Sequence, residues 1–464
     1  MPSGPDGYVA DPKYRQEFEK ARGLVLGHPG RWRVIYHYDA DGIASASSAM
    51  RAFARLGYPA QATALAGVER ERMEELLRAT LEPVLVVDTG ATWLDLYGRH
   101  PHPVVVLDHH KYPEAPNPPV LPPHVAFVDP LNWGVDGMTE MCAATLTWLF
   151  TVFLDPLNWD NAPWGLSGAI GDRQHVGGFH GLNATLVDEA VARSQVVRRP
   201  GVALFGATMG AAITGSIDPF VRGLSGRPEA VGTFLDRLGI DPGRSPRSLT
   251  PDESRRLTEA LRARLTEGRK IPPEALRVFD QERWFLPSLG LDAEEVSNLQ
   301  SAAGRARMSG VGVAYALGDP VAAQRCRDAE ETWRAGILKG LRRLEDEGVN
   351  SMRYLQWFES PELTLAGTQA GMAILYLLDP ERPVFVFSAA PGPTKVSGRG
   401  TFGLIDRGLD LAVVCREAAL AVQGEGGGHR IAAGATIPAH SRDRFLAEAD
   451  RIVGGQIETV GERP

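Results

Sequence analysis

The stretch WRVIYHYDADG, residues 32–42, decides how this sequence folds. Its first part, Trp32–Tyr38, is a short apolar run typical of a buried strand. The segment Ile43–Leu56 behind it has helical patterning, and Gly42 between the two permits a tight turn. The stretch therefore predicts a strand that passes through a sharp turn directly into a helix.

Three polar side chains lie in that turn. Side chains at i and i+2 of an extended chain point the same way, so we expect His37, Asp39 and Asp41 to face one site. The first backbone amides of the helix, near Ile43 and Ser45, are donors that suit an anion. Carboxylates and an amide-rich helix start together predict a site for a cation and a phosphate.

The alternation of apolar runs and helical patterns continues beyond this unit. A helix is expected at Glu69–Ala79 and a loop at the proline-rich stretch 113–123. Further strands are predicted at Ala60–Leu65, Val84–Val87, Val104–Leu107 and Val125–Val128. Because these runs are apolar on both faces, they predict a parallel sheet covered by helices, in an α/β fold. Ligands of such sheets bind beyond the carboxyl ends of the strands.

Acidic and histidine residues fall at that edge. Asp88 follows one predicted strand, and Asp108, His109 and His110 follow the next. Asp172 stands at the end of a later apolar segment. Alone, each patch is an ordinary cap or turn, and Asp-x-Asp-Gly is also half of a calcium loop. At successive strand ends of one domain, they favour Mn²⁺-type ions held by carboxylates and imidazoles. Two such ions about 3.5–4 Å apart can hold a phosphate and activate water.

The rest of the chain changes character twice. The middle region shows charged helical segments such as Thr250–Lys270 and Ala322–Glu347. The last part returns to mixed α/β, with a strand at Val384–Ser388 and a glycine-rich loop at Gly424–Gly428. The sequence predicts three domains, at residues 1–200, 201–345 and 346–464.

Composition limits the class of protein. The chain has 464 residues, 44% hydrophobic and 23% charged, as expected of a globular protein. Its longest apolar run, Leu146–Leu154, is interrupted by threonines and predicts a buried helix instead of a membrane span. Without a signal-like start, and with three scattered cysteines, a cytoplasmic location is expected. A net charge of −8 argues against coating of nucleic acid, but an acidic metal site is compatible with a nuclease.

Two other signals are weaker. Gly398-x-Gly400-x-x-Gly403 has the spacing of a dinucleotide fingerprint, but no strand immediately precedes it. The tryptophans could stack bases, although Trp148 lies in an apolar helical pattern and is expected in the core.

The order His-x-Asp-x-Asp-Gly, strand-Asp, Asp-His-His and Gly-Asp resembles the DHH phosphoesterases, over roughly residues 30–175. GEGGGH at 424–429 is similar to the glycine-rich loop of the DHH-associated substrate-binding domain. KVSGRG at 395–400 and RGLDL at 407–411 resemble archaeal RecJ-like nucleases that associate with the replication factor GINS.

The resemblance implies roles for individual residues. It implies two divalent ions bridged by Asp88. Mn²⁺ is the expected metal, and Mg²⁺ is the alternative. The implied metal ligands are His37, Asp39, Asp41, Asp88, His109 and Asp172. His37 departs from the pyrophosphatase-like branch, whose ligand histidine stands where Ile35 stands here. His110 would face the phosphate and Asp108 would orient a histidine. The implied substrate-binding residues are Arg399, Gly426, Gly427, Gly428 and His429.

The function expected from this resemblance is a two-metal 5′–3′ exonuclease of the RecJ type, acting on single-stranded DNA or RNA in replication or repair. The active site is expected in the cleft between the catalytic and C-terminal domains, and GINS-type replication proteins are the expected protein partners. Two alternatives stay open. One is an oligoribonuclease or cyclic-dinucleotide phosphodiesterase of the same superfamily, and the other is a replication scaffold without catalysis.

Overall fold

The computed structural model describes residues 12–67, 70–280, 282–362, 364–388 and 392–461. The chain forms two compact units. Unit 1 contains the residues up to 199 together with 282–331, and unit 2 contains 200–281 together with 332–464. The long helix α14, Pro320–Glu347, runs from one unit into the other. The finer division into three domains with limits at 200 and 345 stays a prediction.

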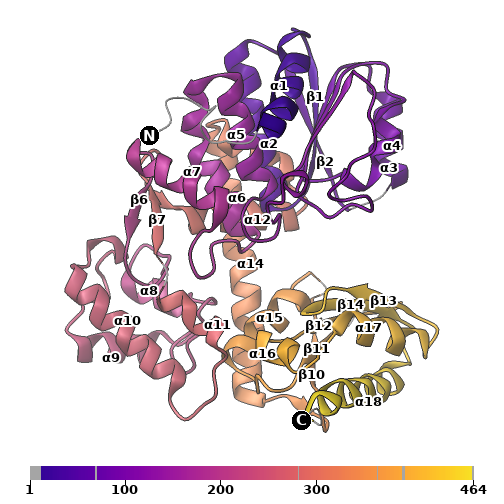
Figure 1. Cartoon of the computed structure of the whole chain (residues 1–464). Helices are drawn as coiled ribbons and strands as arrows, with labels where there is room; N and C mark the ends of the chain where they lie inside the picture. The colour runs from indigo at the N-terminus through magenta and orange to yellow at the C-terminus, as the bar shows by residue number, and fades with distance from the viewer. Residues whose placement is uncertain (1–11, 68–69, 281, 363, 389–391, 462–464) are drawn as a thin grey trace. The chain divides into compact units, whose positions relative to one another are not determined.

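Unit 1 is built on a five-stranded parallel sheet with the order β2-β1-β3-β4-β5 (Figure 1). Its strands are β1 Trp32–His37, β2 Ala60–Leu65, β3 Val84–Val87, β4 Val104–Leu107 and β5 Val125–Val128. Its helices are α1 Pro12–Leu26, α2 Ala40–Leu56, α3 Arg70–Ala79, α4 Leu94–Tyr97, α5 Ala143–Leu154, α6 Ala162–Gly171, α7 Gly181–Ala192, α12 Ala293–Arg305 and α13 Ser309–Ala316. The predicted α/β class and the parallel sheet are confirmed.

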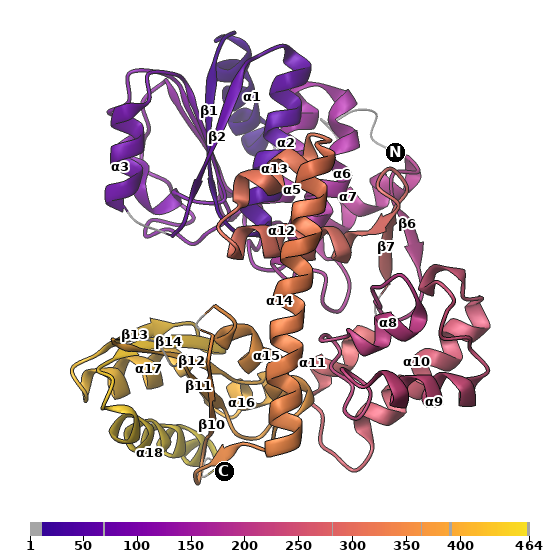
Figure 2. The same ribbon diagram turned by 180° about the vertical axis from the view of Figure 1, so that it is seen from behind.

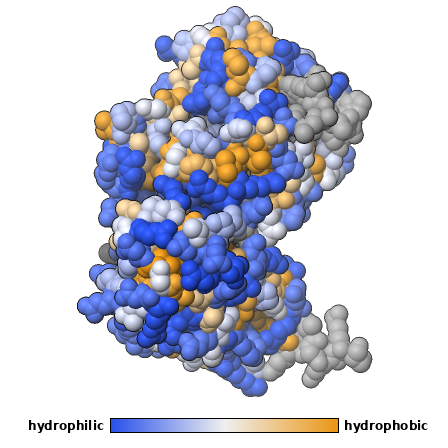
Figure 3. All heavy atoms as spheres, turned by 90° about the vertical axis from the view of Figure 1, so that its left-hand side faces the viewer, coloured by the Kyte–Doolittle hydropathy of each residue, from blue (hydrophilic) through white to orange (hydrophobic). Residues whose placement is uncertain are grey.

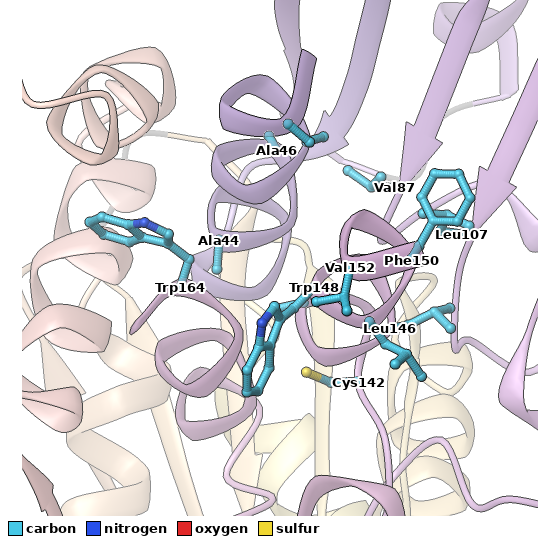
Figure 4. Close-up of a cluster of buried hydrophobic side chains, with 14 of the residues drawn as sticks. Ala44, Ala46, Val87, Leu107, Cys142, Leu146, Trp148, Phe150, Val152 and Trp164 are labelled. Atoms are coloured by element: carbon cyan, nitrogen blue, oxygen red, sulfur yellow. The ribbon is translucent and has the colours of Figure 1, made fainter. Parts of the chain in front are cut away.

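Alternate residues of each strand pack on opposite faces of this sheet. Val34 and Tyr36 of β1 belong to the core beneath α2 and α5, and Ile35 between them belongs to the core beneath α3. Every residue of α5 is buried, because helices and strands surround it. In Figure 4, Val87 and Leu107 of the strands lie beside Phe150 of that helix. Burial on both faces explains why these strands are continuous apolar runs.

Residues 282–331 return to unit 1 after the intervening segment 200–281, which belongs to unit 2. A small antiparallel sheet joins β6 Val197–Arg199, β7 Arg283–Leu286 and β8 Leu291–Asp292. Helices α12 and α13 then pack on α2, and α12 also packs on α6 (Figure 2). The stretch between β6 and β7 is helical, as predicted, with α8 Met209–Thr214, α9 Pro228–Leu238, α10 Pro251–Thr266 and α11 Pro273–Leu276.

Unit 2 contains a mixed six-stranded sheet with the order β13-β14-β12-β11-β10-β9. The strands are β9 Asn350–Ser351, β10 Gln356–Ser360, β11 Val384–Ser388, β12 Thr394–Arg399, β13 Glu425–Gly428 and β14 Ala432–Ile437. Its C-terminal helices are α15 Ala366–Tyr376, α16 Phe402–Asp406, α17 Leu411–Leu420 and α18 Arg442–Gly461. The predicted mixed α/β character of this part is confirmed.

The glycine-rich segment was predicted as a loop, and that prediction was wrong. Residues Glu425–Gly428 form strand β13, which pairs with β14. A Cβ atom on Gly426 would lie 2.3 Å from the Cys415 carbonyl oxygen, and one on Gly428 would lie 2.7 Å from the Cα of Ala433. Gly426 therefore lets helix α17 approach the strand backbone, and Gly428 lets β14 do so, close contacts that turn statistics do not reveal.

On the face drawn in Figure 3, hydrophilic residues predominate and apolar residues form small patches. Among the helices that the structure describes, none is both long and apolar enough to cross a membrane.

One buried carboxyl makes the stability of the fold depend on pH. Glu294, in the first turn of α12, is 6% exposed, and neither of its carboxylate oxygens has a hydrogen-bond partner among the described residues. Burial, with the charge of Asp292 adding to it, raises the pKa of Glu294 to about 8 from an ordinary value of 4.5. Above pH 4.5 the unfolded chain loses this proton while the folded chain keeps it until about pH 8. Stability should therefore fall with rising pH through this window, by at most about 1.4 kcal/mol per pH unit.

We expect Glu294→Gln to remove that dependence, since an amide carries no charge to bury. The melting temperature of the variant should exceed that of the wild type clearly at pH 8 and only slightly at pH 5. Thermal unfolding at both values measures the difference. An equal shift at the two pH values would show that Glu294 is not protonated in the folded chain.

Candidate metal centre

The turn after β1 divides its three polar side chains between two places. Asp39 caps helix α2, where its Oδ1 accepts a hydrogen bond from the Gly42 amide at 3.1 Å. Because the helix begins at Ala40, Asp41 lies in its first turn and not in extended chain. The expectation that His37, Asp39 and Asp41 face one site through strand alternation was therefore wrong in its geometry, because the helix rotates Asp41 into a second group.

The first group is His37, Asp39 and Asp88, which we call the outer triad. His37 Nδ1 lies 3.0 Å from Asp39 Oδ2 and 3.6 Å from Asp88 Oδ2. The candidate ligand atoms of the three residues all lie within 4.8 Å of one another. The Asp39 side chain is 41% exposed, so this group is open to solvent on one side.

The second group is Asp41, His109 and Asp172, which we call the inner triad. His109 Nε2 lies 3.5 Å from Asp41 Oδ2 and 3.4 Å from Asp172 Oδ2. Asp172 follows helix α6, so the expectation that all the patches stand at strand ends fails at this position. Helix α6 brings it to the sheet edge because its own residues, from Ala162 to Ile170, are buried against α2 and α5.

Backbone groups hold Asp41 in place. Its Oδ2 accepts from the Ala143 amide at 3.0 Å and its Oδ1 from the Ala144 amide at 2.8 Å. These amides begin helix α5, whose N-terminus favours a negative charge. A Cβ on Gly168 would lie 2.7 Å from Asp41 Oδ1, so α6 needs a glycine where it passes this carboxylate.

Asp88 connects the two triads. Its Oδ2 faces His37, while its Oδ1 lies 3.4 Å from His109 Nε2. The residue has a φ of 58°, in the left-handed region that few non-glycine residues occupy, although aspartate tolerates it better than most. Its amide donates to the Leu107 carbonyl at 3.0 Å, which anchors the residue to the neighbouring strand end. Strained backbone of this kind gathers at functional sites.

The charges of the cluster are not balanced. Burial, together with repulsion from Asp88, raises the pKa of Asp41 to about 7. Burial and the charge of Asp41 likewise raise the pKa of Asp172 to about 7. Burial lowers the pKa of His37, but its contacts with Asp39 and Asp88 outweigh this and raise the value to about 11. All three pKa values are raised, so each group favours its protonated form. A surplus of buried negative charge has this effect, and it indicates a place where a cation would be stabilised.

Unpaired atoms in the cluster fit that need. His37 Nδ1, Asp88 Oδ2 and His109 Nε2 are buried and have no hydrogen-bond partner among the described residues. Leaving such atoms unsatisfied costs free energy, and coordination of a cation would satisfy them. Carboxylate oxygens and imidazole nitrogens are ligands that Mn²⁺ accepts, with Mg²⁺ favouring the oxygens. The residues present therefore fit two divalent ions, one for each triad.

His110 has a different environment. Its Nδ1 lies 2.8 Å from Asp108 Oδ1, and its side chain is 52% exposed. Asp108 also accepts from the amides of Ala91 and His109, both at 2.8 Å, so its carboxylate is fixed on several sides. Burial lowers the pKa of His110, but the charge of Asp108 and the contact with it raise the value to about 9. Asp108 therefore fixes the orientation of the His110 ring.

The C-terminal residues named from the sequence lie on β12 and β13 of the second sheet and in the turn that follows β13. Arg399 ends β12 opposite Ala432, and Gly428 ends β13 opposite Ala433. His429 lies in the turn between β13 and β14 and is exposed. Gly426 and Gly427 belong to the same strand, β13. The structure thus gathers this predicted group within unit 2.

Sequence reasoning missed the groups that support His109. Its Nδ1 donates to the Gly137 carbonyl at 2.7 Å, and Gln174 and Asn183 extend that contact. Gln174 follows Asp172 by two residues, which was the one available signal, and the Ala143 and Ala144 amides gave none because any residue carries an amide.

Comparison with known proteins agrees with this architecture. Residues 366–455 match the model of the DHHA1 domain. An uncharacterized protein of Methanocaldococcus jannaschii is 25% identical over 438 residues, covering 93% of this chain and 95% of that protein.

Two solved structures share the fold. A crystal structure of exonuclease RecJ bound to manganese superposes with a TM-score of 0.59 at 19% identity, covering 97% of this chain and 96% of that one. CDC45 from Entamoeba histolytica superposes with a TM-score of 0.62 at 8% identity, covering 98% and 100% of the two chains. The predicted fold, a parallel-sheet N-terminal domain, a helical middle and a mixed α/β C-terminal domain that contains the DHHA1 match, is confirmed.

Proposed function

We propose that this protein is a two-metal phosphodiesterase that degrades single-stranded nucleic acid. One observation carries the proposal: Asp88 presents one oxygen to each of two triads of metal-ligand type. A carboxylate shared by two such groups is typical of sites that hold a phosphate between paired ions. The RecJ structure with the same fold is that of an exonuclease and contains manganese, which supports the same reading here.

In this proposal the outer and inner triads each bind one ion, Mn²⁺ or Mg²⁺. Bound there, the ions would activate a water molecule and neutralise charge on the phosphate. His110, held by Asp108, would donate a hydrogen bond from its exposed ring edge to a phosphate oxygen as negative charge develops there. Asp108 keeps that ring oriented and is itself too buried to meet the substrate.

We assign substrate binding within unit 2 to Arg399, His429 and the glycines of β13. Arg399 and His429 supply donors for a phosphate, and the bare glycine backbone lets the strand approach one closely. Degradation from the 5′ end, a role in replication or repair, and GINS-type partner proteins are further parts of the proposal, and they rest on the RecJ-like sequence motifs.

Digestion of end-labelled oligonucleotides tests the proposal. We would incubate the full chain with 5′-labelled and 3′-labelled single-stranded DNA and RNA in Mn²⁺, beside duplexes of the same sequence. The expected result is stepwise release of mononucleotides from the 5′ end of single strands, with chelation of the metal stopping the reaction.

Other outcomes point to the alternatives. Hydrolysis confined to oligomers of two or three nucleotides, or to cyclic dinucleotides, would replace the strand exonuclease by a small-substrate phosphodiesterase. Absence of metal-dependent cleavage on every substrate would contradict the proposal and favour a scaffold.

A further inference from the structure

The carbonyl oxygen of Gly137 accepts two side-chain hydrogen bonds. One comes from His109 Nδ1 at 2.7 Å and the other from Gln174 Nε2 at 2.8 Å. Gln174 Oε1 in turn accepts from Asn183 Nδ2 at 2.6 Å. A buried chain of contacts therefore joins the end of β4, the loop before α5, the turn after α6 and the first turn of α7.

This series of hydrogen bonds determines the tautomer of His109. A carbonyl oxygen only accepts, so the proton of the contact must be on Nδ1. In the neutral ring the lone pair is then on Nε2, the atom that faces Asp41, Asp88 and Asp172 at 3.4–3.5 Å. A hydrogen bond on the far nitrogen that fixes ring orientation and tautomer is the usual support of a metal-binding histidine.

Gln174 and Asn183 are placed to hold that carbonyl. They are 4% and 0% exposed, so their amide groups depend on partners within the protein. Because Asn183 donates to Gln174 Oε1, the NH₂ group of Gln174 must face Gly137. The backbone N–H of Asn183 also donates to the Glu140 carbonyl at 2.9 Å, which links α7 to the same loop.

The turn after α6 couples Gln174 to another member of the inner triad. The backbone N–H of Gln174 donates to the Ala169 carbonyl at 2.9 Å, and Arg173 has a φ of 59°. The chain therefore reverses immediately after Asp172, and one rigid turn sets both Asp172 and Gln174.

We infer that Gln174 and Asn183 are positioning residues for the inner triad, fixing His109 with Nε2 directed at the metal through the Gly137 carbonyl. This inference rests on the metal-binding part of the proposed function. Among the described residues, no side chain fixes the ring of His37 in the outer triad in this way, and Asp39 of that triad is 41% exposed. The inner triad is consequently the higher-affinity of the two sites, and Gln174 and Asn183 affect that site alone.

Metal titration of the full chain tests the inference without any substrate. We would follow Mn²⁺ binding to metal-stripped protein by calorimetry and by the electron paramagnetic resonance signal of free Mn²⁺. The wild type should bind in two steps, and Gln174→Leu should weaken the tighter step about 10–100-fold while leaving the weaker one unchanged. Asn183→Leu should act on the same step, and the double variant should be no worse than the more affected single one, because both act through one carbonyl.

Gln300→Leu is the matched control. Gln300 is fully buried in the same unit, its Oε1 accepts from Ser167 Oγ at 2.8 Å, and among the described residues it has no hydrogen bond to a proposed ligand. It should lower the melting temperature of the metal-free chain much as Gln174→Leu does, yet leave both binding steps unchanged. Hydrogen exchange of the His109 Nδ1 proton in Mg²⁺-loaded protein gives a second readout, slow in the wild type and fast in Gln174→Leu.

Different negative results would overturn this inference alone or the proposed function with it. If the wild type binds two ions and hydrolyses its substrate but Gln174→Leu binds both ions as the wild type does, only this inference is overturned. Equal weakening in Gln300→Leu would overturn it too, since the effect would then follow from general destabilisation. A wild-type chain that binds no Mn²⁺ would overturn the proposed function together with this inference.

Discussion

Replacing Asp88 by asparagine is expected to abolish phosphodiester hydrolysis, with kcat/KM falling on the order of 10³-fold or more, as when one member of a cooperating catalytic unit is removed. Asp88 Oδ2 lies 3.6 Å from His37 Nδ1 and its Oδ1 lies 3.4 Å from His109 Nε2. An amide offers one neutral oxygen where the carboxylate offers two charged ones, so both ions would be held less tightly. Steady-state kinetics with Mn²⁺ on a labelled single strand measures the loss.

The same variant should leave the fold intact. Burial and the charge of Asp39 raise the pKa of Asp88, so the carboxylate is unfavourable in the metal-free chain and an amide should be tolerated at least as well. We therefore expect an unchanged or higher melting temperature without metal. Asp95→Asn, the same chemical change at a side chain that is 54% exposed, should behave as wild type. Activity of Asp88→Asn within tenfold of wild type would contradict the bridging role.

Replacing His110 by alanine should lower kcat by about 10²–10³-fold, the usual cost of removing one donor that stabilises a developing oxyanion. Mn²⁺ affinity should stay close to that of the wild type. His110 Nδ1 is already engaged by Asp108 Oδ1 at 2.8 Å, and the nearest Asp88 oxygen is 3.9 Å away. The rest of the ring is therefore available to a substrate. Rapid-quench kinetics at saturating Mn²⁺, paired with metal titration, separates the two effects.

His28→Ala controls for loss of a histidine, because His28, two residues past the end of α1, is exposed and its Nδ1 contacts the Leu24 carbonyl. It should leave kcat unchanged. Asp88, His109 and His110 also form a group of metal-ligand type. Loss of a Mn²⁺ site in His110→Ala, in parallel with loss of activity, would therefore identify His110 as a ligand and contradict the role assigned to it.

Much of unit 1 was predictable because its signals are local. The five strands of the sheet are short apolar runs, and four of them were predicted with the bounds that the structure shows. The fifth, β1, ends one residue earlier than predicted, at His37, where the turn begins. Parallel strands place their carboxyl ends along one edge. The proximity of Asp88 and His109 was therefore expected, because each follows a predicted strand.

Other parts of the site depend on contacts that a sequence does not display. Asp172 reaches the cluster from the end of α6, and only the packing of that helix on α2 and α5 brings it there. Two backbone amides of α5 hold Asp41, and any residues could supply them. The support of His109 by Gly137, Gln174 and Asn183 joins four segments through side-chain hydrogen bonds, which periodicity and motif spacing cannot reveal.

Anomalous diffraction from crystals grown with Mn²⁺ shows whether Asp88 bridges two metal ions, because it locates the ions without reference to any substrate. We expect two peaks in the anomalous difference map, one contacted by His37, Asp39 and Asp88, and the other by Asp41, His109, Asp172 and again Asp88. A map with no peak at this cluster, or with a single peak that Asp88 does not contact, would contradict that bridging role.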